Sequence, residues 1–303
     1  MLEVRRLRLL WELSRHGTIA ATARVCSLTP SAVSQQLALL EREVGSPLLL
    51  RDGRRLVLTE AARVLVEHTE QVLADLEAAE AGVAELSSTV QGVLTIAAFP
   101  TAARALVPAA IARCRAEHPG LRLRLTEQGQ VAGAIDALKA GDVDVALVYS
   151  YNLLPRVRVP GVTTEKLLTE PLLAALPASG RPDGPIALGE LAEHQWIAAQ
   201  RDDDLRVMLE RACGLAGFAP ALDFTSSDYT VIFALVEAGL GVSLVPRLAL
   251  ESMSTRIQLR EIAEPALSRT ISVAVRAGSS RNPPIAAVLA ALRTVAAEIV
   301  RGE

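Results

Sequence analysis

The sequence is poor in the residues from which metal sites and disulfide frameworks are built. Its 303 residues include only 3 cysteines and 4 histidines. The cysteines, Cys26, Cys114 and Cys213, are odd in number, scattered and without metal-ligand spacing. We therefore expect no metal site, and buried thiols in a protein of a reducing compartment.

Signals for export and membrane insertion are also missing. Charged residues between positions 3 and 8 interrupt the hydrophobic core that a signal peptide would need there. The most apolar later stretch, 229–250, contains an acidic residue, two glycines and a proline, so it does not predict a membrane span. We expect a cytoplasmic protein without a membrane partner.

Motifs of catalysis and cofactor binding are absent as well. Gly239-Leu240-Gly241 lacks the third glycine and the acidic residue of a dinucleotide-binding fingerprint, and there is no P-loop. Asp142 and Asp144 are two apart at the start of a predicted strand, so their side chains would point to opposite faces. We therefore predict no enzyme and no cofactor, although catalytic groups that converge only in space leave no such motif.

Charge is distributed unevenly along the chain, whose overall net charge is only −3. Residues 1–58 carry nine arginines against five acidic residues, residues 59–91 carry one against seven, and residues 92–303 are nearly balanced. A basic head on a near-neutral body is expected of a chain with one nucleic-acid-binding module, although uneven surface charge also occurs without function. The chain has 303 residues, of which 50% are hydrophobic, so it can bury large cores and is expected to form more than one domain.

A helix-turn-helix pattern begins at Thr18, which can cap a short alanine-rich helix. After a turn at 26–28, Thr29 is a good N-cap and Pro30 suits the first helical position, because its missing N–H has no partner there. The second helix is predicted over 30–44, with one apolar stripe. Its opposite face is short and polar, as required of an element that enters the ~12 Å major groove of DNA. That face contains Ser31, Ser34, Gln35, Ala38 and Arg42.

A basic hairpin is predicted after this helix. The apolar runs 48–50 and 56–58 flank Arg51-Asp52-Gly53-Arg54-Arg55, in which Asp-Gly is a strong turn signal. Three arginines at a loop tip can probe phosphates or a minor groove. Taken alone, the helix-turn-helix pattern also describes ordinary three-helix packing, and an arginine-rich turn also describes a solvated surface. The combination of the two favours DNA binding.

One long helical pattern extends over 60–86, with Thr59 placed to cap it. Apolar and small residues recur at alternating steps of four and three, which is the spacing of a coiled-coil seam. The seam comprises Ala61, Leu65, His68, Val72, Leu76, Ala79, Val83 and Leu86. Because a helix this long and acidic gains little by folding alone, we predict a homodimer that presents two reading heads to a two-part DNA site. The alternative is a helix that packs only against its own chain.

Polar residues at 87–92 predict a hinge, and beyond it strands and helices alternate. The first set has strands at 92–98, 121–126 and 143–149 and helices at 101–117 and up to 139, an order that implies a parallel sheet covered on both faces. The second set has strands at 172–176, 196–199, 222–225 and 242–245 and helices at 203–215 and 229–238. A strand at 270–275 and a helix at 283–300 follow. We predict two α/β lobes with a cleft between them, the tail returning to the first lobe.

The segment Ser31-Ala32-Val33-Ser34-Gln35-Gln36-Leu37 resembles the N-terminal domain of LysR-type transcriptional regulators. The resemblance covers the whole chain, through Phe99-Pro100-Thr101, the strand entry at 141–146 and Ala238-Gly239-Leu240-Gly241-Val242. It implies an α+β multidomain fold: a winged helix-turn-helix domain at 1–58, a dimerising linker helix and hinge at 59–91, and an effector-binding domain like periplasmic binding proteins at 92–303. Lobe I of that domain would comprise 92–165 and 268–303, and lobe II 166–267. The resemblance also implies a homotetramer, often a dimer of dimers.

The DNA contacts of the family carry over by position. They place Ser31, Ser34 and Gln35 at base edges, and Arg51 and Arg54 on the backbone or in the minor groove. The chain departs from the family at Thr29-Pro30, where many members carry Ser-Gln, and in its wing, which has Leu49-Leu50-Arg51 where Leu-Phe-x-Arg is usual. Hydroxyls and a carboxamide can read several bases, so the operator sequence does not follow from them. The predicted DNA-binding residues are Thr29, Pro30, Ser31, Ser34, Gln35, Arg51, Arg54 and Arg55.

Candidate effector contacts lie at strand-to-helix turns of both lobes, the usual ligand edge of α/β sheets. Phe99-Pro100-Thr101 offers N–H groups and a hydroxyl at a helix start, which suit a carboxylate, unless Thr101 merely caps its helix. Arg201 and the acidic residues 202–204 could form ion pairs with the two charged groups of an amino acid, although a solvated, acidic helix start also explains them. The predicted effector-binding residues are Phe99, Thr101, Gln130, Arg201, Asp203, Ser226 and Ser227.

These features predict a cytoplasmic transcriptional regulator whose DNA binding responds to a small molecule in the cleft. Closure or rotation of the lobes would pass through the linker helices to the DNA-binding heads, for which a coupling of ~1–3 kcal/mol suffices. Two alternatives stay open. One is a ligand-independent DNA-binding regulator with a vestigial cleft, and the other a small-molecule-binding protein whose helical head only mediates assembly.

Overall fold

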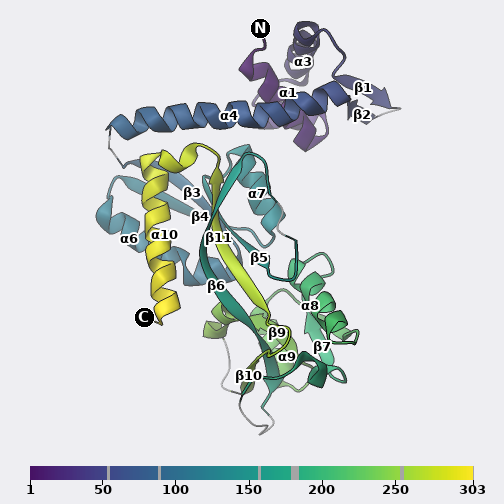
Figure 1. The fold of residues 1–303 in the computed structure, drawn as a ribbon. Coiled ribbons are helices and arrows are strands. Elements are labelled where there is room, and N and C mark those ends of the chain that lie inside the picture. Colours follow the sequence, from purple (N-terminus) through teal and green to yellow (C-terminus); the bar gives the residue numbers. More distant parts are fainter. Residues whose placement is uncertain (53–54, 88–89, 156–157, 179–183, 253–255, 303) are drawn as a thin grey trace.

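The computed structural model describes residues 1–302 apart from 53–54, 88–89, 156–157, 179–183 and 253–255. Three parts follow one another along the chain (Figure 1): a small helical head, one long helix that lies across the body, and a two-lobed body. The body begins at residue 92 and contains all of the large sheet. The two residues of the predicted hinge at 88 and 89 lie outside the described part of the chain.

The head consists of α1 (Val4–His16), α2 (Ile19–Val25), α3 (Pro30–Val44) and the hairpin β1 (Leu49–Asp52) and β2 (Arg55–Leu58). The predicted caps are confirmed: the Thr18 and Thr29 hydroxyls accept hydrogen bonds of 3.2 Å from the N–H groups of Ala21 and Ala32. The bounds of α3 agree with the prediction, whereas α1 was not predicted. Helices α1 and α3 pack through a core that includes Leu10, Val33, Leu37, Leu40 and Leu48.

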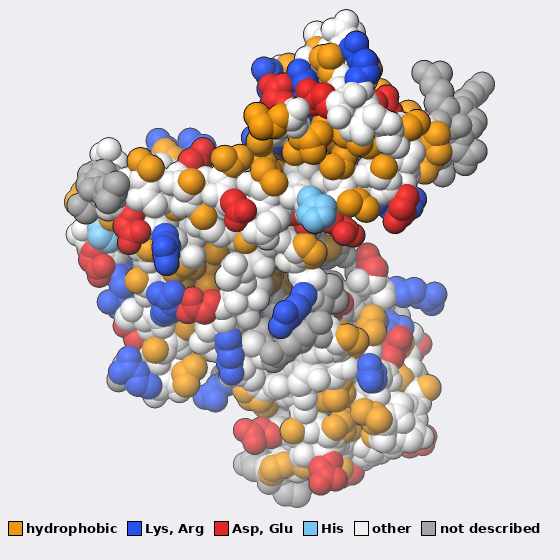
Figure 2. All heavy atoms as spheres, turned by 45° about the horizontal axis from the view of Figure 1, so that its top comes forward, with side chains coloured by type: hydrophobic (Ala, Val, Ile, Leu, Met, Phe, Trp, Pro, Cys, Tyr) orange, Lys and Arg blue, Asp and Glu red, His pale blue; other side chains and the backbone are white. Residues whose placement is uncertain are grey.

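Helix α4 (Glu60–Ser87) is 28 residues long and begins at Thr59, whose hydroxyl accepts a hydrogen bond from the Ala62 N–H at 3.2 Å. One face packs against its own chain, because Ala62, Thr69, Ala74 and Ala81 are buried. The later part of the predicted seam is exposed, with Leu76 at 44% and Val83 at 70%. Figure 2 shows hydrophobic side chains where the head meets this helix and along the helix itself. The described residues therefore cover the first part of the seam, near the head, and leave its later part exposed.

The body is built on one large sheet with the strand order β10-β6-β11-β5-β3-β4, in which β9 also pairs with β6. The strands are β3 (Gly92–Ala98), β4 (Leu121–Glu127), β5 (Val145–Tyr151), β6 (Val162–Pro177), β9 (Ser243–Pro246), β10 (Ile257–Glu261) and β11 (Ser268–Arg276). The predicted parallel arrangement holds for β4, β3 and β5, but β11 runs antiparallel to β5 and β6. The reason is that β6 and β11 are the two connections between the lobes, and they run side by side in opposite directions (Figure 1).

Lobe I is covered by α5 (Pro100–Ala105), α6 (Val107–Glu117), α7 (Val131–Ala140) and α10 (Pro283–Arg301). The prediction of one helix over 101–117 was wrong, because the chain breaks at Leu106. Pro108, the second residue of α6, has no N–H to donate to the preceding turn, and its ring clashes with the carbonyl four residues earlier. Helix α10 has the length and hydropathy of a membrane span. Its apolar face, including Val288, Leu292 and Val295, packs in the core of lobe I, as the predicted return of the tail requires.

Lobe II contains the parallel pair β7 (Gln195–Ala198) and β8 (Ala221–Thr225), helices α8 (Asp204–Leu215) and α9 (Tyr229–Glu237), and strands β9 and β10. Short 3-10 helices lie at η1 (Leu188–Leu191), η2 (Arg247–Ser252) and, in lobe I, η3 (Ser279–Arg281). The strand predicted near 172–176 is only the end of the 16-residue β6, and β10 was not predicted. The predicted division between the lobes at 165/166 therefore falls inside a continuous strand.

Candidate functional site

The exposed face of α3 presents the residues predicted to read DNA. Thr29, Pro30, Ser31, Ser34 and Gln35 are all exposed and gather on the first turns of this helix. The Ser34 hydroxyl donates to the Pro30 carbonyl at 3.0 Å, and the hydroxyls of Thr29 and Ser31 lie 3.0 Å apart. Small polar groups without bulky neighbours can approach base edges closely in a major groove.

Buried residues on the other side of α3 hold this face in place. Val33 and Leu40 are fully enclosed, and Leu37 is 2% exposed. One carboxylate oxygen of Glu41 accepts hydrogen bonds from the N–H groups of Leu48 (2.8 Å) and Leu49 (3.1 Å). The reading helix is therefore fixed both to the core of the head and to the start of the hairpin.

The backbone register of the hairpin places two of the predicted wing residues next to its turn. Arg51 is paired with Leu56 and Asp52 with Arg55 in the register of β1 and β2, so these residues adjoin the turn. Arg54, the third predicted arginine contact, lies outside the described residues. The backbone thus forms the predicted wing beside α3 (Figure 1).

A second candidate site is a cavity of about 80 Å³ between the lobes. Five of the seven predicted effector residues line it, namely Phe99, Thr101, Asp203, Ser226 and Ser227. Gln130 does not, because its side-chain amide donates to the Asp202 carboxylate at 3.2 Å and so bridges the two lobes beside the cavity. Arg201 is exposed in the turn before α8 and does not line the cavity either. The strand-to-helix turns do converge, but not all of their side chains point inward.

Arg269 is the central cavity residue that sequence reasoning missed. It is 2% exposed, and its Nε and Nη2 donate to one oxygen of Glu170 at 2.9 and 2.6 Å, while Nη2 also donates to the Thr101 hydroxyl at 2.9 Å. Its Nη1 has no acceptor among the described residues. The other oxygen of Glu170 accepts from the Leu248 N–H at 2.7 Å. Although burial opposes the charge of Arg269, the Glu170 carboxylate raises the pKa of the guanidinium above its usual value.

Three tyrosines, also not predicted as site residues, complete the cavity wall: Tyr149, Tyr151 and Tyr229. Tyr149 contacts Phe99 edge to face, with ring centroids 4.8 Å apart. The guanidinium of Arg269 lies 5.0 Å from the centroid of the Phe99 ring. Burial raises the pKa of Tyr229 to about 12 and that of Tyr149 above its usual value, so both hydroxyls stay protonated. The available signal was Tyr151, two residues beyond Tyr149 at the end of the predicted strand, because extended backbone puts residues two apart on one face.

Asp203 supplies the acidic side of the cavity. Its carboxylate caps α8 by accepting a hydrogen bond from the Leu205 N–H at 2.8 Å. Burial raises the pKa of Asp203, and the cap hydrogen bond opposes this shift. The cavity therefore holds a cation and an anion from different lobes, with hydroxyl and aromatic groups between them. Among the described residues, no cluster of three His, Cys, Asp or Glu side chains could hold a metal ion.

Comparison with known protein families assigns a family to the head and to the body of the chain. The family described as "Bacterial regulatory helix-turn-helix protein, lysR family" matches residues 4–63, and the family "LysR substrate binding domain" matches residues 87–297. The chain belongs to the LysR family. It is accordingly a DNA-binding transcriptional regulator, with a head that binds operator DNA, a domain that binds a small-molecule effector, and an oligomeric assembly.

Individual LysR-family relatives match over nearly the full length. The chain is 28% identical over 276 residues to the transcriptional dual regulator GltC of Bacillus subtilis (strain 168), covering 90% of each sequence. It is 27% identical over 293 residues to the nitrogen assimilation regulatory protein nac of Klebsiella aerogenes, covering 95% of this chain and 93% of the relative.

Solved LysR-type structures share the fold. A full-length OxyR variant from Pseudomonas aeruginosa superposes with a TM-score of 0.65 at 22% identity, covering 97% of this chain and 98% of that one. Full-length CbnR in complex with its target DNA gives a TM-score of 0.54 at 23% identity, covering 97% and 100%. The order of head, linker helix and two-lobed body is therefore common to the three proteins.

Proposed function

We propose that the chain is a cytoplasmic, non-enzymatic regulator that reads its operator with α3 and senses a compact carboxylate or amino acid between its lobes. Residues 1–58 form the DNA-binding domain, 59–91 the linker and 92–303 the effector domain. The observation that carries the effector assignment is the convergence of Arg269, Thr101 and Asp203, from both lobes, on one cavity. The wing arginines Arg51, Arg54 and Arg55 supply phosphate or minor-groove contacts.

The chemistry of the cavity favours an amphoteric ligand. Nη1 of Arg269 and the hydroxyls of Thr101 and Ser226 suit a carboxylate, because a guanidinium binds carboxylate oxygens with several aligned N–H groups. Asp203 suits an ammonium group, and a bound ammonium would lower the raised pKa of this carboxyl again. The volume of about 80 Å³ favours a small ligand. Ligand contacts to both lobes would stabilise a closed arrangement, and the linker would carry that difference to the heads.

The DNA assignment is tested by footprinting the purified protein on the intergenic DNA upstream of its own gene at several salt concentrations. We expect a protected site with approximate twofold symmetry. Replacing Arg51 and Arg54 by alanine should weaken binding and flatten its salt dependence if both neutralise phosphates. Protection that both variants retain at every salt concentration would refute the assignment of the wing.

The effector assignment is tested by thermal shift and calorimetry with a panel of amino acids and small carboxylates. Thr101→Val should remove binding of any member that stabilises the unaltered protein. Thr169→Val is the matched control, since Thr169 pairs with Thr270 across the strands and does not line the cavity. Equal loss in both variants, or binding that survives Thr101→Val, would contradict the proposed site.

A further inference from the structure

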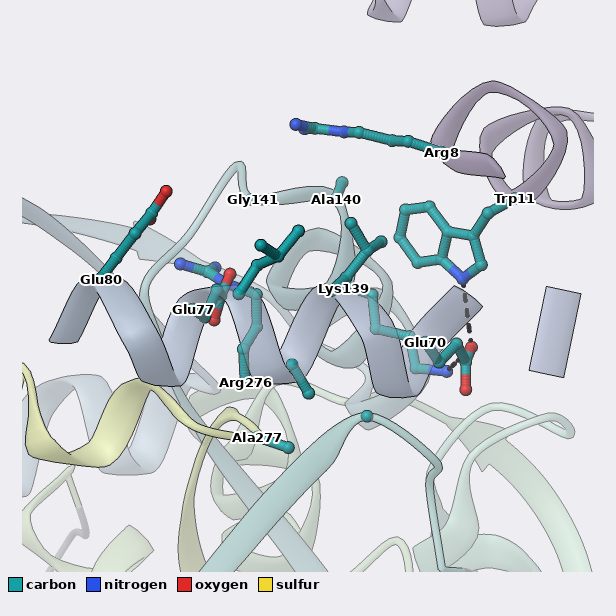
Figure 3. Close-up of a pocket in the computed structure, with 14 residues that line it drawn as sticks. Arg8, Trp11, Glu70, Glu77, Glu80, Lys139, Ala140, Gly141, Arg276 and Ala277 are labelled. Atoms are coloured by element: carbon teal, nitrogen blue, oxygen red, sulfur yellow. Dashed lines mark hydrogen bonds and ion pairs between the residues drawn. The ribbon is translucent and has the colours of Figure 1, made fainter. Parts of the chain in front are cut away.

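The head, the linker helix and lobe I meet around a cavity of about 340 Å³ (Figure 3). One carboxylate oxygen of Glu70, on α4, joins all three parts. It pairs with the Lys139 ammonium of lobe I at 2.8 Å and accepts a hydrogen bond from the Trp11 indole of the head at 3.2 Å. Glu70 and Lys139 are each only 15% exposed, so this ion pair is well shielded from solvent.

A second contact joins α4 to the far end of β11. Arg276, the last residue of this strand, forms an ion pair with Glu77 of α4. The same guanidinium donates to two carbonyls of lobe I, those of Val143 at 2.8 Å and Leu138 at 3.1 Å. Because Arg276 is anchored within lobe I by these bonds, its pair with Glu77 ties the linker helix to the lobe.

Gly278 brings the backbone of lobe I into direct contact with α4. Its φ is +90°, in the left-handed region that favours glycine. A Cβ at this position would lie 2.3 Å from the carbonyl oxygen of Ala74 and 2.9 Å from the Cβ of Ala78, both on the linker helix. Any other residue would therefore have to push α4 away from the lobe.

Strand β11 links this contact to the effector cavity. Arg269 lies in the cavity near one end of the strand, and Arg276 and Gly278 hold α4 at the other. The stretch from residue 269 to residue 276 spans roughly 23 Å in extended form. We propose that Arg276 and Gly278 are positioning residues that dock the linker helix on lobe I and couple the position of the DNA-binding head to the state of the cavity. The inference rests on the effector site proposed above.

The first test uses Gly278→Ala with Gly141→Ala as its matched control. Gly141 also has a left-handed backbone, at φ +81°, and lines the same 340 Å³ cavity, but a Cβ there would meet nothing within 4 Å. Both variants thus carry similar backbone strain, and only Gly278→Ala disturbs α4. Each is footprinted on the upstream DNA of the gene. For Gly278→Ala we expect protection to be gained or lost over about 10 bp, one helical turn, while Gly141→Ala keeps the original footprint.

The second test measures the coupling without a ligand, by hydrogen exchange in the effector cavity. Coupling is reciprocal, so release of α4 must alter the cavity if the cavity controls α4. In Gly278→Ala, amides of α5 and of residues 226–229 should exchange at rates changed by about 5-fold or more. A purely structural role of Gly278 in holding the helix would leave these distant amides unchanged.

A third test exchanges the charges of the Glu70–Lys139 ion pair and does not depend on the folding of Gly278→Ala. Glu70→Lys and Lys139→Glu should each alter the footprint, and the double variant should restore it in part, because the ion pair returns but a lysine cannot accept the Trp11 hydrogen bond. Partial restoration of the footprint by the double variant, together with changed cavity exchange in the single variants, supports the proposal. It is overturned if folded Gly278→Ala behaves like Gly141→Ala, or if the single charge variants leave footprint and exchange unchanged. Failure of the unaltered protein to protect DNA would refute the operator assignment instead, and ligand binding that survives Thr101→Val would refute the effector site.

Discussion

The buried pair of Arg269 and Glu170 allows stability and ligand sensing to be separated. Glu170→Ala removes two of the three hydrogen bonds that Arg269 donates and leaves the guanidinium enclosed with only the Thr101 hydroxyl as acceptor. Breaking a buried ion pair from one side costs about 3–5 kcal/mol, because the remaining charge has lost its compensation. For a domain of this size we expect a fall in Tm on the order of 10 °C.

The double variant Glu170→Leu with Arg269→Met should recover most of this loss. Apolar side chains of similar volume fill the space without a charge to desolvate, and such replacements of buried pairs are often neutral in stability. Binding of the carboxylate ligand should be lost in this double variant, since the thioether introduced by Arg269→Met offers no hydrogen-bond donor to it.

Melting followed by circular dichroism and titration calorimetry measure the two effects. A Tm loss below about 2 °C in Glu170→Ala would show that the pair is not buried as described, because less than about 1 kcal/mol corresponds to a solvent-exposed pair. Ligand binding of original strength in the double variant would show that Arg269 does not contact the ligand.

Three further predictions concern other parts of the molecule. Gln35→Ala should weaken operator binding by about 1–3 kcal/mol in gel-shift titrations and leave Tm unchanged if this exposed amide contacts a base, as we propose; an unchanged affinity would contradict that role. Val83→Glu should dissociate the dimer in sedimentation, because it places a charge in the exposed seam of α4, whereas Glu80→Gln, beside the seam, should not. Burial raises the pKa of Glu12, so its ionised form destabilises the folded state above its ordinary pKa and has no effect where it is protonated in both states. Glu12→Gln should therefore raise Tm at about pH 7 but not at about pH 3, and a gain of equal size at both pH values would contradict this account.

Local patterns in the sequence predicted the head most accurately. The bounds of α3 follow from Thr29 and Pro30 at its start and Gly45 at its end, where the backbone turns left-handed. Capping and chain reversal depend on residues within a few positions of one another, so a single sequence contains what is needed to place them. The miss over 101–117 was of the same local kind, since Pro108 itself signals the break.

Long-range pairing could not be predicted in the same way. The residues of β6 between 162 and 169 are mostly polar, because this part of the strand lies on the surface of lobe I, and their pattern resembles a loop. The sequence places Gly241 in an incomplete nucleotide motif and in one segment of the family resemblance, and neither predicts a packing contact. In the structure, its lack of a side chain lets β9 approach the Gln195 carbonyl, to which a Cβ would come within 2.7 Å.

The sequence by itself determined the reading helix, the wing, the linker helix and the order of the lobes, because each depends on short-range spacing and capping. Only the tertiary structure paired Arg269 with Glu170, 99 residues away, and brought Gly278 against the linker helix. These contacts depend on strand register and on the angle at which elements pack. Both are set by the whole core rather than by neighbouring residues.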